Sequence, residues 1–267
     1  MSYKMIAIPA FNDNYIWLYM NEESNTGIVV DPGDGMAALG TVVSYNVSIS
    51  AVFITHHHRD HIGGIYSLLH WLCCEDDSLL HEIPVYGPKR EWIPRVSHQL
   101  SDTETLSIPH FPLFEILEIP GHTRGHIGYY NREKGILFCG DTLFGGGCGR
   151  IFEGTPEILF KSLQKINQLP PETLIYCAHE YTEKNLAFAL SIEPNNLALQ
   201  ERYSQVCALR KKNEPTVPST LALEQQTNPF LRTNAKEVVE KVSTQLGKKD
   251  LSPVEIFATL RAWKDDF

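Results

Sequence analysis

Histidines and an aspartate crowd into one short stretch of the chain, between an expected strand and an expected helix. The stretch reads Thr55-His56-His57-His58-Arg59-Asp60-His61-Ile62-Gly63-Gly64. Alternate side chains of an extended segment share a side, so His56, His58 and Asp60 are expected to converge while the residues between them point away. His61 breaks this alternation where the chain turns into the helix, which lets it join Asp60 on a second centre.

Three further loops carry ligand-type side chains, and each follows an apolar run that predicts a strand. They are Gly121-His122-Thr123, Gly140-Asp141-Thr142 and Ala178-His179-Glu180. Loops at one edge of a sheet are where sites assemble, because the scaffold fixes them in place. Imidazole and carboxylate suit zinc, iron or manganese. The chain therefore offers seven ligands, which is enough for two ions that share one carboxylate.

The elements that must hold these loops are short strands followed by helices. Apolar runs predict strands at Tyr15 to Met20, Ile28 to Val30, Ala51 to Ile54, Glu115 to Ile119, Ile136 to Cys139 and Leu174 to Cys177. Helices are expected between them at about Gly35 to Tyr45, Gly63 to Leu72 and Pro156 to Leu169, the last capped by Thr155. After Tyr181 the pattern is helical and convincing strands stop. A mixed α/β domain followed by a helical appendage is predicted.

Composition and charge narrow the class of protein. The chain has 267 residues, 43% of them hydrophobic, and a net charge of -9, which argues against nucleic acid or an anionic membrane as partner. It has neither a signal-peptide pattern nor a long apolar run, so we expect a cytoplasmic protein. Its six cysteines include no CxxC pair, so disulfides are not expected. We expect it to act as a monomer.

With the later His, Asp and His, the H-x-H-x-D-H loop resembles the metallo-beta-lactamase superfamily. Within it the chain is similar to the glyoxalase II (hydroxyacylglutathione hydrolase) family. The matching segments are Val30-Asp31-Pro32-Gly33-Asp34, Gly140-Asp141-Thr142-Leu143-Phe144, Gly147-Cys148-Gly149-Arg150 and Ala178-His179-Glu180-Tyr181-Thr182. The match runs from Ile8-Pro9-Ala10-Phe11 to Lys264-Asp265-Asp266-Phe267 and covers nearly the whole chain.

The resemblance implies an α+β fold, a four-layer αββα sandwich with a C-terminal all-helical domain. The catalytic domain would span residues 1–180 and the helical substrate-binding domain residues 181–267. One ion would take His56, His58 and His122, and the other Asp60, His61 and His179. Asp141 would bridge the two ions, and Asp60 and Asp141 are the expected catalytic carboxylates. Zinc is the expected metal, and iron and manganese are alternatives.

The resemblance also implies the reaction. S-2-hydroxyacylglutathione, with S-D-lactoylglutathione as the type case, would be hydrolysed to glutathione and a 2-hydroxy acid (D-lactate) by a hydroxide held between the two ions. This is the second step of the glyoxalase route that detoxifies methylglyoxal. The expected glutathione contacts are Arg150, Phe152, Tyr181, Arg261 and Lys264. Some members have tyrosine where this chain has Phe152, so a hydroxyl contact there would be lost.

Several nearby residues are expected to support the site without binding metal. Asp31 is predicted to order the metal loop through hydrogen bonds, and His57 and His126 are predicted to stay outside the ligand set. Rival functions remain at this point: a lactonase, a glutathione persulfide dioxygenase with a single iron at His56, His122 and Asp141, a beta-lactamase, or a non-catalytic metal-binding protein. The helical tail with Arg261 and Lys264 and the full second-metal set argue against the first two. The absence of a signal-peptide pattern and of a cysteine at any ligand position argues against a beta-lactamase, and the complete ligand set argues against a non-catalytic protein.

Overall fold

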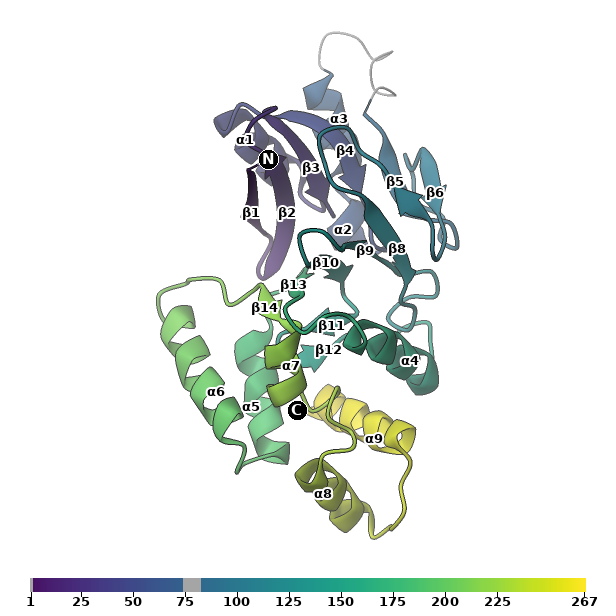
Figure 1. Cartoon of the computed structure of the whole chain (residues 1–267), viewed down its shortest axis with the longest axis vertical. Helices are drawn as coiled ribbons and strands as arrows, with labels where there is room; N and C mark the ends of the chain where they lie inside the picture. The colour runs from purple at the N-terminus through teal and green to yellow at the C-terminus, as the bar shows by residue number, and fades with distance from the viewer. Residues whose placement is uncertain (1, 74–82) are drawn as a thin grey trace. The chain divides into compact units, whose positions relative to one another are not determined.

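The N-terminal part of the chain forms a mixed six-stranded sheet. The computed structural model describes residues 2–73 and 83–267, so the predictions for Cys74 lie outside the described residues. The strands lie in the order β1-β2-β3-β4-β5-β6 (Figure 1). β2 pairs antiparallel with β1 and β3, and the later pairs are parallel. The bounds are Tyr3–Ala10, Asn14–Asn21, Thr26–Val30, Ser48–Phe53, Val85–Pro88 and His98–Leu100.

Two helices pack on one face of this sheet. They are α1 (Gly35–Ser44) and α3 (Ile65–Leu72), with the short α2 (Arg59–Ile62) before α3. Asp34 caps α1, because its carboxylate accepts from the backbone N–H groups of Met36 and Ala37. Apolar side chains from both helices and from β2, β3 and β4 form one buried cluster, which includes Leu18, Val29, Ala38, Val42, Val52, Ile54, Leu68 and Leu69. The helices are therefore held by burial of their apolar faces.

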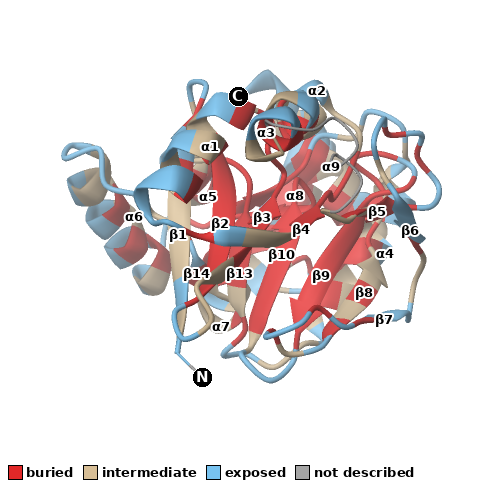
Figure 2. Ribbon diagram, turned by 90° about the horizontal axis from the view of Figure 1, so that it is seen from above, coloured by how far each residue is buried: buried red, intermediate tan, exposed pale blue. Residues whose placement is uncertain are grey.

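Aromatic side chains join the other face of this sheet to a second set of strands. Their bounds are Thr105–Leu106 (β7), Phe114–Glu118 (β8), Ile127–Asn131 (β9) and Ile136–Gly140 (β10), and neighbouring strands pair antiparallel. Phe53 stacks on Tyr129 at 4.4 Å between ring centroids and meets Phe114 edge-on at 5.1 Å. Every residue of β9 and β10 is buried (Figure 2). A strand buried on both faces is a rigid support for the loops at its ends.

The chain divides into two compact units, Met1–Glu118 with Arg124–Gly140, and Ile119–Thr123 with Asp141–Phe267. The second unit is mainly helical. Its helices are Pro156–Asn167 (α4), Thr182–Ile192 (α5), Leu197–Arg210 (α6), Leu221–Thr227 (α7), Lys236–Leu246 (α8) and Pro253–Asp266 (α9). Its strands are Leu143–Phe144 (β11), Gly147–Cys148 (β12), Leu174–Cys177 (β13) and Ser219–Thr220 (β14). Thr155 caps α4 as predicted, since its side chain accepts from the N–H of Ile158.

The expected elements lie close to the observed ones, with two kinds of exception. The strands before Tyr181 without a counterpart among the predicted ones are β1, β5, β6, β7, β9, β11 and β12. The expectation that strands stop after Tyr181 is wrong, because β14 pairs with β13 through Ser219 and Thr220. A two-residue strand is defined by backbone pairing alone and leaves no apolar pattern to read.

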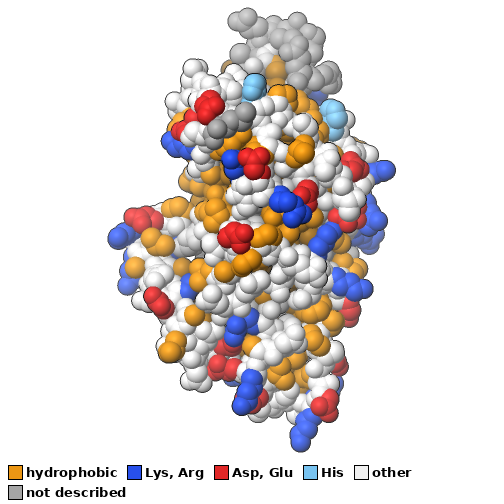
Figure 3. Space-filling model, in the orientation of Figure 1, with side chains coloured by type: hydrophobic (Ala, Val, Ile, Leu, Met, Phe, Trp, Pro, Cys, Tyr) orange, Lys and Arg blue, Asp and Glu red, His pale blue; other side chains and the backbone are white. Residues whose placement is uncertain are grey.

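The surface carries charges of both signs. On the face that Figure 3 draws, lysine and arginine side chains are interspersed with aspartate and glutamate. The net charge of -9 is therefore not gathered into a single patch on that face. Within the described part of the chain, no helix has the length and apolar character that crossing a bilayer requires.

Candidate metal centre

The histidine loop leaves β4 in an extended conformation and turns sharply after His58. His58 precedes α2 with φ −61° and ψ 144°, and the backbone N–H of His61 already donates to its carbonyl. His56 and His61 are almost fully buried, at 0% and 1% exposure. Because α2 begins at Arg59, Asp60 lies in a helical turn and not at the end of an extended segment. The alternation predicted for this stretch therefore ends at His58.

The carboxylate of Asp31 forms hydrogen bonds with residues at both ends of the histidine loop. Its carboxylate accepts from the backbone N–H and the hydroxyl of Thr55, each at 2.8 Å, and its Oδ2 lies 3.0 Å from Nδ1 of His61. Asp31 is itself buried and has a left-handed backbone conformation with φ +52°. Few non-glycine residues adopt this conformation, so the three contacts must outweigh its cost. Asp31 orders the loop through hydrogen bonds, as expected from the sequence.

In the second unit, Asp141 lies between two histidines. Its Oδ2 is 3.4 Å from Nε2 of His122 and 3.4 Å from Nε2 of His179. All three residues are buried, and each follows the end of an apolar run or strand, as predicted. One carboxylate oxygen that faces two imidazole nitrogens is the arrangement a bridging ligand needs.

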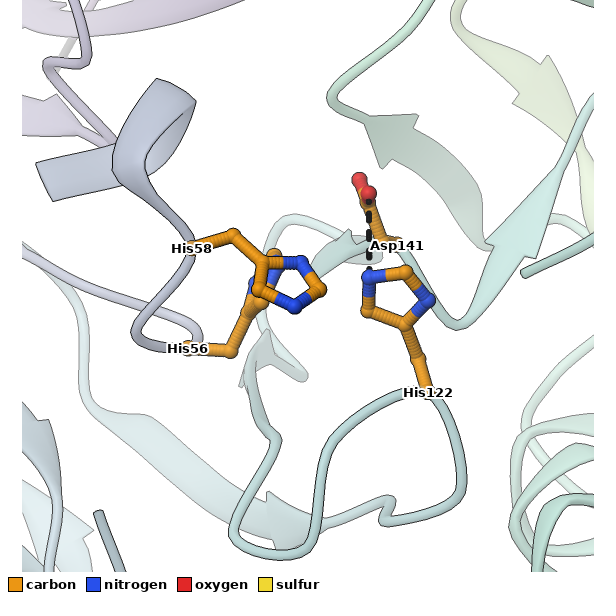
Figure 4. A group of neighbouring side chains, drawn as sticks. All are labelled: His56, His58, His122 and Asp141. Atoms are coloured by element: carbon orange, nitrogen blue, oxygen red, sulfur yellow. Dashed lines mark hydrogen bonds and ion pairs between the residues drawn. The ribbon is translucent and has the colours of Figure 1, made fainter. Parts of the chain in front are cut away.

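Two groups of side chains could hold metal ions. The first comprises His56, His58, His122 and Asp141, and the second comprises Asp60, His61 and His179. Each residue in a group offers one ligand atom, and these atoms lie within 4.8 Å of one another. Figure 4 draws the first group, and its dashed line marks the contact between His122 and Asp141. His57 and His126 belong to neither group among the described residues.

Three of the histidine rings are oriented by an oxygen atom at Nδ1. The contacts are His56 to the Thr55 hydroxyl at 3.0 Å, His61 to Asp31 at 3.0 Å, and His122 to the carbonyl of Arg150 at 2.8 Å. A partner at Nδ1 fixes the tautomer and presents Nε2 as the ligand atom. Oriented imidazoles beside carboxylates are a donor set for divalent transition metals, so the residues fit the predicted ions.

Glu91 is a supporting residue that sequence reasoning missed. Its side chain is 3% exposed. It accepts from the backbone N–H of His57 at 2.7 Å and from that of Gly125 at 2.9 Å. His57 lies between two candidate ligands, so Glu91 fixes the backbone that carries both. The local sequence Lys89-Arg90-Glu91-Trp92 resembles a charged surface turn and holds no signal of this role.

The side chains predicted to bind glutathione lie in different environments. Phe152 is 62% exposed, and its ring meets that of His122 edge-on at 5.2 Å. The Tyr181 ring stacks on His179 at 4.7 Å. Arg150 is exposed, and its Nε lies 3.3 Å from a carboxylate oxygen of Asp265.

Arg261 and Lys264 differ from each other in burial. Arg261 is only 5% exposed, and its Nη1 donates to the carbonyl of Cys148 at 2.8 Å. Lys264 is half-buried, and its Nζ lies over the rings of Phe188 and Phe267. Burial lowers the pKa of Lys264, and the neighbouring charges of Arg261, Arg150 and Lys184 lower it further.

A buried network anchors the loop that leads to Arg150. Glu224 is completely buried and accepts from the backbone N–H of Gly146 at 2.8 Å and from Arg202 at 2.5 Å. Asn228 donates to the carbonyl of Gly147 at 3.0 Å. Buried charges are stable when they are paired and fully hydrogen-bonded. Together with Arg261, these residues fix the backbone of the β11–β12 hairpin.

The buried cysteines are unsuited to nucleophilic chemistry. Burial raises the pKa of the Cys177 thiol to about 12, and it also raises the pKa of Cys148. A thiol must ionise to act as a nucleophile. Cys139 and Cys177 are fully buried in their strands.

Comparisons with known proteins agree with this geometry. The family model for the metallo-beta-lactamase superfamily matches residues 13–179, and that for the hydroxyacylglutathione hydrolase C-terminus matches residues 180–267. The hydroxyacylglutathione hydrolase of Pseudomonas aeruginosa (strain LESB58) is 45% identical over 263 residues, 98% of each chain. That of Nitrosomonas eutropha is 46% identical over 261 residues, 97% of each chain.

The fold also has counterparts among solved structures. The crystal structure of the BLEG-1 B3 metallo-beta-lactamase superposes with a TM-score of 0.63 and 22% sequence identity, over 86% of this chain and 99% of that one. The predicted α+β fold, a metallo-beta-lactamase sandwich with a C-terminal helical domain, is confirmed.

Proposed function

The chain belongs to the hydroxyacylglutathione hydrolase family of the metallo-beta-lactamase superfamily, and from this premise we infer that it hydrolyses S-2-hydroxyacylglutathione thioesters. The products are glutathione and a 2-hydroxy acid. S-D-lactoylglutathione, which yields D-lactate, is the substrate we place first. The observation that carries this inference is the identity of 45% to a hydroxyacylglutathione hydrolase over 98% of the chain.

Seven residues are proposed to hold two metal ions. His56, His58 and His122 would hold one ion, Asp60, His61 and His179 would hold the other, and Asp141 would contribute to both. The two side-chain groups and the equal 3.4 Å distances from Asp141 Oδ2 to His122 and His179 support this division. Zinc is the metal proposed, since these ligands suit it, although iron and manganese accept the same set. Two divalent cations, when bound, lower the pKa of water from about 16 towards about 7 and so supply a nucleophile at neutral pH.

The reaction adds the oxygen of water to the thioester carbonyl carbon and breaks the carbon–sulfur bond. Glutathione leaves as a thiolate with a pKa of about 8.5 to 9, so the chain needs no separate acid to protonate it. The role of the protein is to fix positions. Asp31 holds His61, the Arg150 carbonyl holds His122, and Glu91 holds the backbone at His57. Such outer contacts keep the ligands in one orientation before substrate arrives.

We also propose two domains with different roles, a catalytic domain at residues 1–180 and a substrate-binding domain at residues 181–267. The family models that meet between residues 179 and 180 support this boundary. Glutathione is proposed to contact Arg150, Phe152, Tyr181, Arg261 and Lys264. Phe152 can offer an apolar contact but no hydroxyl hydrogen bond.

One experiment tests the proposed function. A metal-replete preparation is assayed with lactoylglutathione, acetyl-coenzyme A, a lactone and a beta-lactam under identical conditions. We expect lactoylglutathione to be hydrolysed far faster than the other three, and we expect Asp141→Ala to abolish that activity. A preparation with full metal content that prefers the lactone or the beta-lactam would refute the proposal.

A further inference from the structure

A hollow with a volume of about 460 Å³ opens within the first unit. We call it the Phe11 hollow, and its lining residues are Phe11, Asn14, Gly33, Arg59, Asp60 and Gly63. Asp60 belongs to one of the two candidate metal groups, so the hollow begins at the centre where the thioester would react. Its volume lies within the range of roughly 300–1,000 Å³ that small-molecule sites occupy.

Phe11 is an unusual residue for the position it holds. It lies in the turn between β1 and β2, where Ala10 pairs with Asn14, and its φ is +51°. Phe11 is 59% exposed. Left-handed backbone is unfavourable for a residue other than glycine. An exposed aromatic ring beside a hollow can pack against a ligand that enters it.

At Gly33 the wall of the hollow is formed by the backbone, because this residue has no side chain. A Cβ atom added to Gly33 would lie 1.6 Å from the carbonyl oxygen of Asp60, so a larger residue cannot replace this glycine without moving the metal loop. Asn14 donates from Nδ2 to Oδ2 of Asp60 at 2.9 Å, which fixes that carboxylate at the edge of the hollow. The hollow is therefore rigid where it meets the candidate ligand.

Charge distinguishes the two ends of a glutathione thioester. The glutathione part carries two carboxylates, whereas the acyl part carries none. Among the described lining residues, the charged side chains are the exposed Arg59 and the candidate ligand Asp60. One cation beside a carboxylate does not match a dianion. An aromatic ring, an amide and a guanidinium do match an uncharged group with one hydroxyl and one apolar substituent.

We propose that the Phe11 hollow receives the 2-hydroxyacyl group of the thioester, and that Phe11 sets the preference among acyl substituents by packing against them. The assignment rests on the proposed hydrolysis and adds where the acyl group lies. The volume exceeds what a lactoyl group needs, so larger 2-hydroxyacyl groups with an aromatic substituent fit the same hollow. Aromatic pairs gain free energy beyond the area they bury, so Phe11 should contribute most to the binding of such substrates.

The test compares S-lactoylglutathione with S-mandeloylglutathione in the metal-replete full-length protein. Phe11→Ala keeps the Cβ atom, so the backbone remains as restricted as in the parent. We expect kcat/KM for the mandeloyl substrate to fall roughly tenfold and that for the lactoyl substrate to fall less than about twofold. Phe11→Leu keeps an apolar side chain without a ring, and its kcat/KM for the mandeloyl substrate should lie between those of the parent and of Phe11→Ala.

Leu113→Ala is the matched control, because Leu113 is also 59% exposed. It lies in the loop whose His110 carbonyl accepts from Tyr3 and Asn21, at the opposite end of the β1–β2 hairpin from Phe11. It should leave both substrates unchanged. Metal content and Tm are measured for all variants.

An equal fall for the two substrates, or no fall with Phe11→Ala, overturns the assignment of the hollow while the proposed function stands. If the parent protein hydrolyses neither thioester, the proposed function itself fails and the assignment fails with it.

Discussion

The carboxylate of Glu91 contacts His57 at two points, since its Oε2 lies 2.7 Å from the backbone nitrogen and 2.9 Å from Nδ1 of the ring. Its other oxygen accepts from the N–H of Gly125 at 2.9 Å. A single buried carboxylate therefore fixes the backbone between His56 and His58 and the loop before His126. His57 supports the metal loop through its main chain, although it is not a candidate ligand.

Glu91→Ala should weaken metal binding more than His57→Ala does. The glutamate variant removes the acceptor of the N–H groups of His57 and Gly125, whereas the histidine variant keeps the backbone bond to Glu91. Loss of an outer-shell partner typically costs about 10–100-fold in metal affinity, and we expect Glu91→Ala to fall in that range. Metal transfer to a chelator at graded concentrations measures the affinity, and Glu91→Gln should recover part of it. If His57→Ala loses metal as readily as Glu91→Ala, the ring and not the backbone carries the support.

Asp141→Ala should remove both ions, because one carboxylate oxygen faces a histidine of each group at 3.4 Å. His179→Ala removes a ligand from one group alone and should retain the ion held by His56, His58 and His122. Metal stoichiometry by mass spectrometry checks the difference, with fewer than one ion per chain expected for Asp141→Ala and about one for His179→Ala. Equal stoichiometry in the two variants would contradict the bridging role.

The histidine loop was largely predictable from the sequence, and its error has a physical reason. Residue types and spacing indicate the ligand-type side chains at 56, 58, 60 and 61. Alternation then groups Asp60 with His56 and His58, but the N–H groups of His61 and Ile62 donate to the carbonyl of His58 and begin a helix at Arg59. The break in alternation at His61 predicted a second centre shared with Asp60, and the structure places both residues in one group. A helix of four residues is too short to leave a recognisable helical pattern in the sequence.

Contacts distant in sequence were not predictable. Glu91 lies 34 residues from both His57 and Gly125, and Arg261 lies 113 residues from the Cys148 carbonyl that it contacts. The spacing of three residues in a helix predicts that Arg261 and Lys264 share a face. Whether either side chain is buried depends on the residues that pack against it from distant parts of the chain. The local sequence pattern does not indicate this burial.

Replacement of Arg261 should therefore lower stability, whereas replacement of Lys264 should weaken substrate binding. Arg261→Ala leaves the carbonyl of Cys148 without its donor, and we expect the free energy of unfolding to fall by about 1–3 kcal/mol. Lys264→Ala should leave stability nearly unchanged and raise KM for lactoylglutathione roughly tenfold, with kcat altered little. Urea unfolding and steady-state kinetics separate the two effects. A loss of stability in Lys264→Ala equal to that in Arg261→Ala would mean that both residues are structural.

Binding of the anionic substrate should weaken at a lower alkaline pH than it would if Lys264 had an ordinary lysine pKa. Burial, Arg261, Arg150 and Lys184 all lower the pKa of Lys264, so it loses its proton below the usual lysine value of about 10.4. The charged form attracts the substrate carboxylates, so KM should be steady near neutral pH and rise as pH approaches the lowered pKa. Lys264→Arg keeps its charge throughout this range because the guanidinium pKa exceeds about 12, and its KM should rise less.

The arginine variant also controls for titration of the substrate amine, which affects both proteins equally. KM is measured between pH 7 and 10 with the spontaneous hydrolysis of the thioester subtracted, and Lys264→Ala should show a high KM with the weakest pH dependence. Parallel KM curves for the parent and Lys264→Arg would show that a group other than Lys264 controls substrate capture.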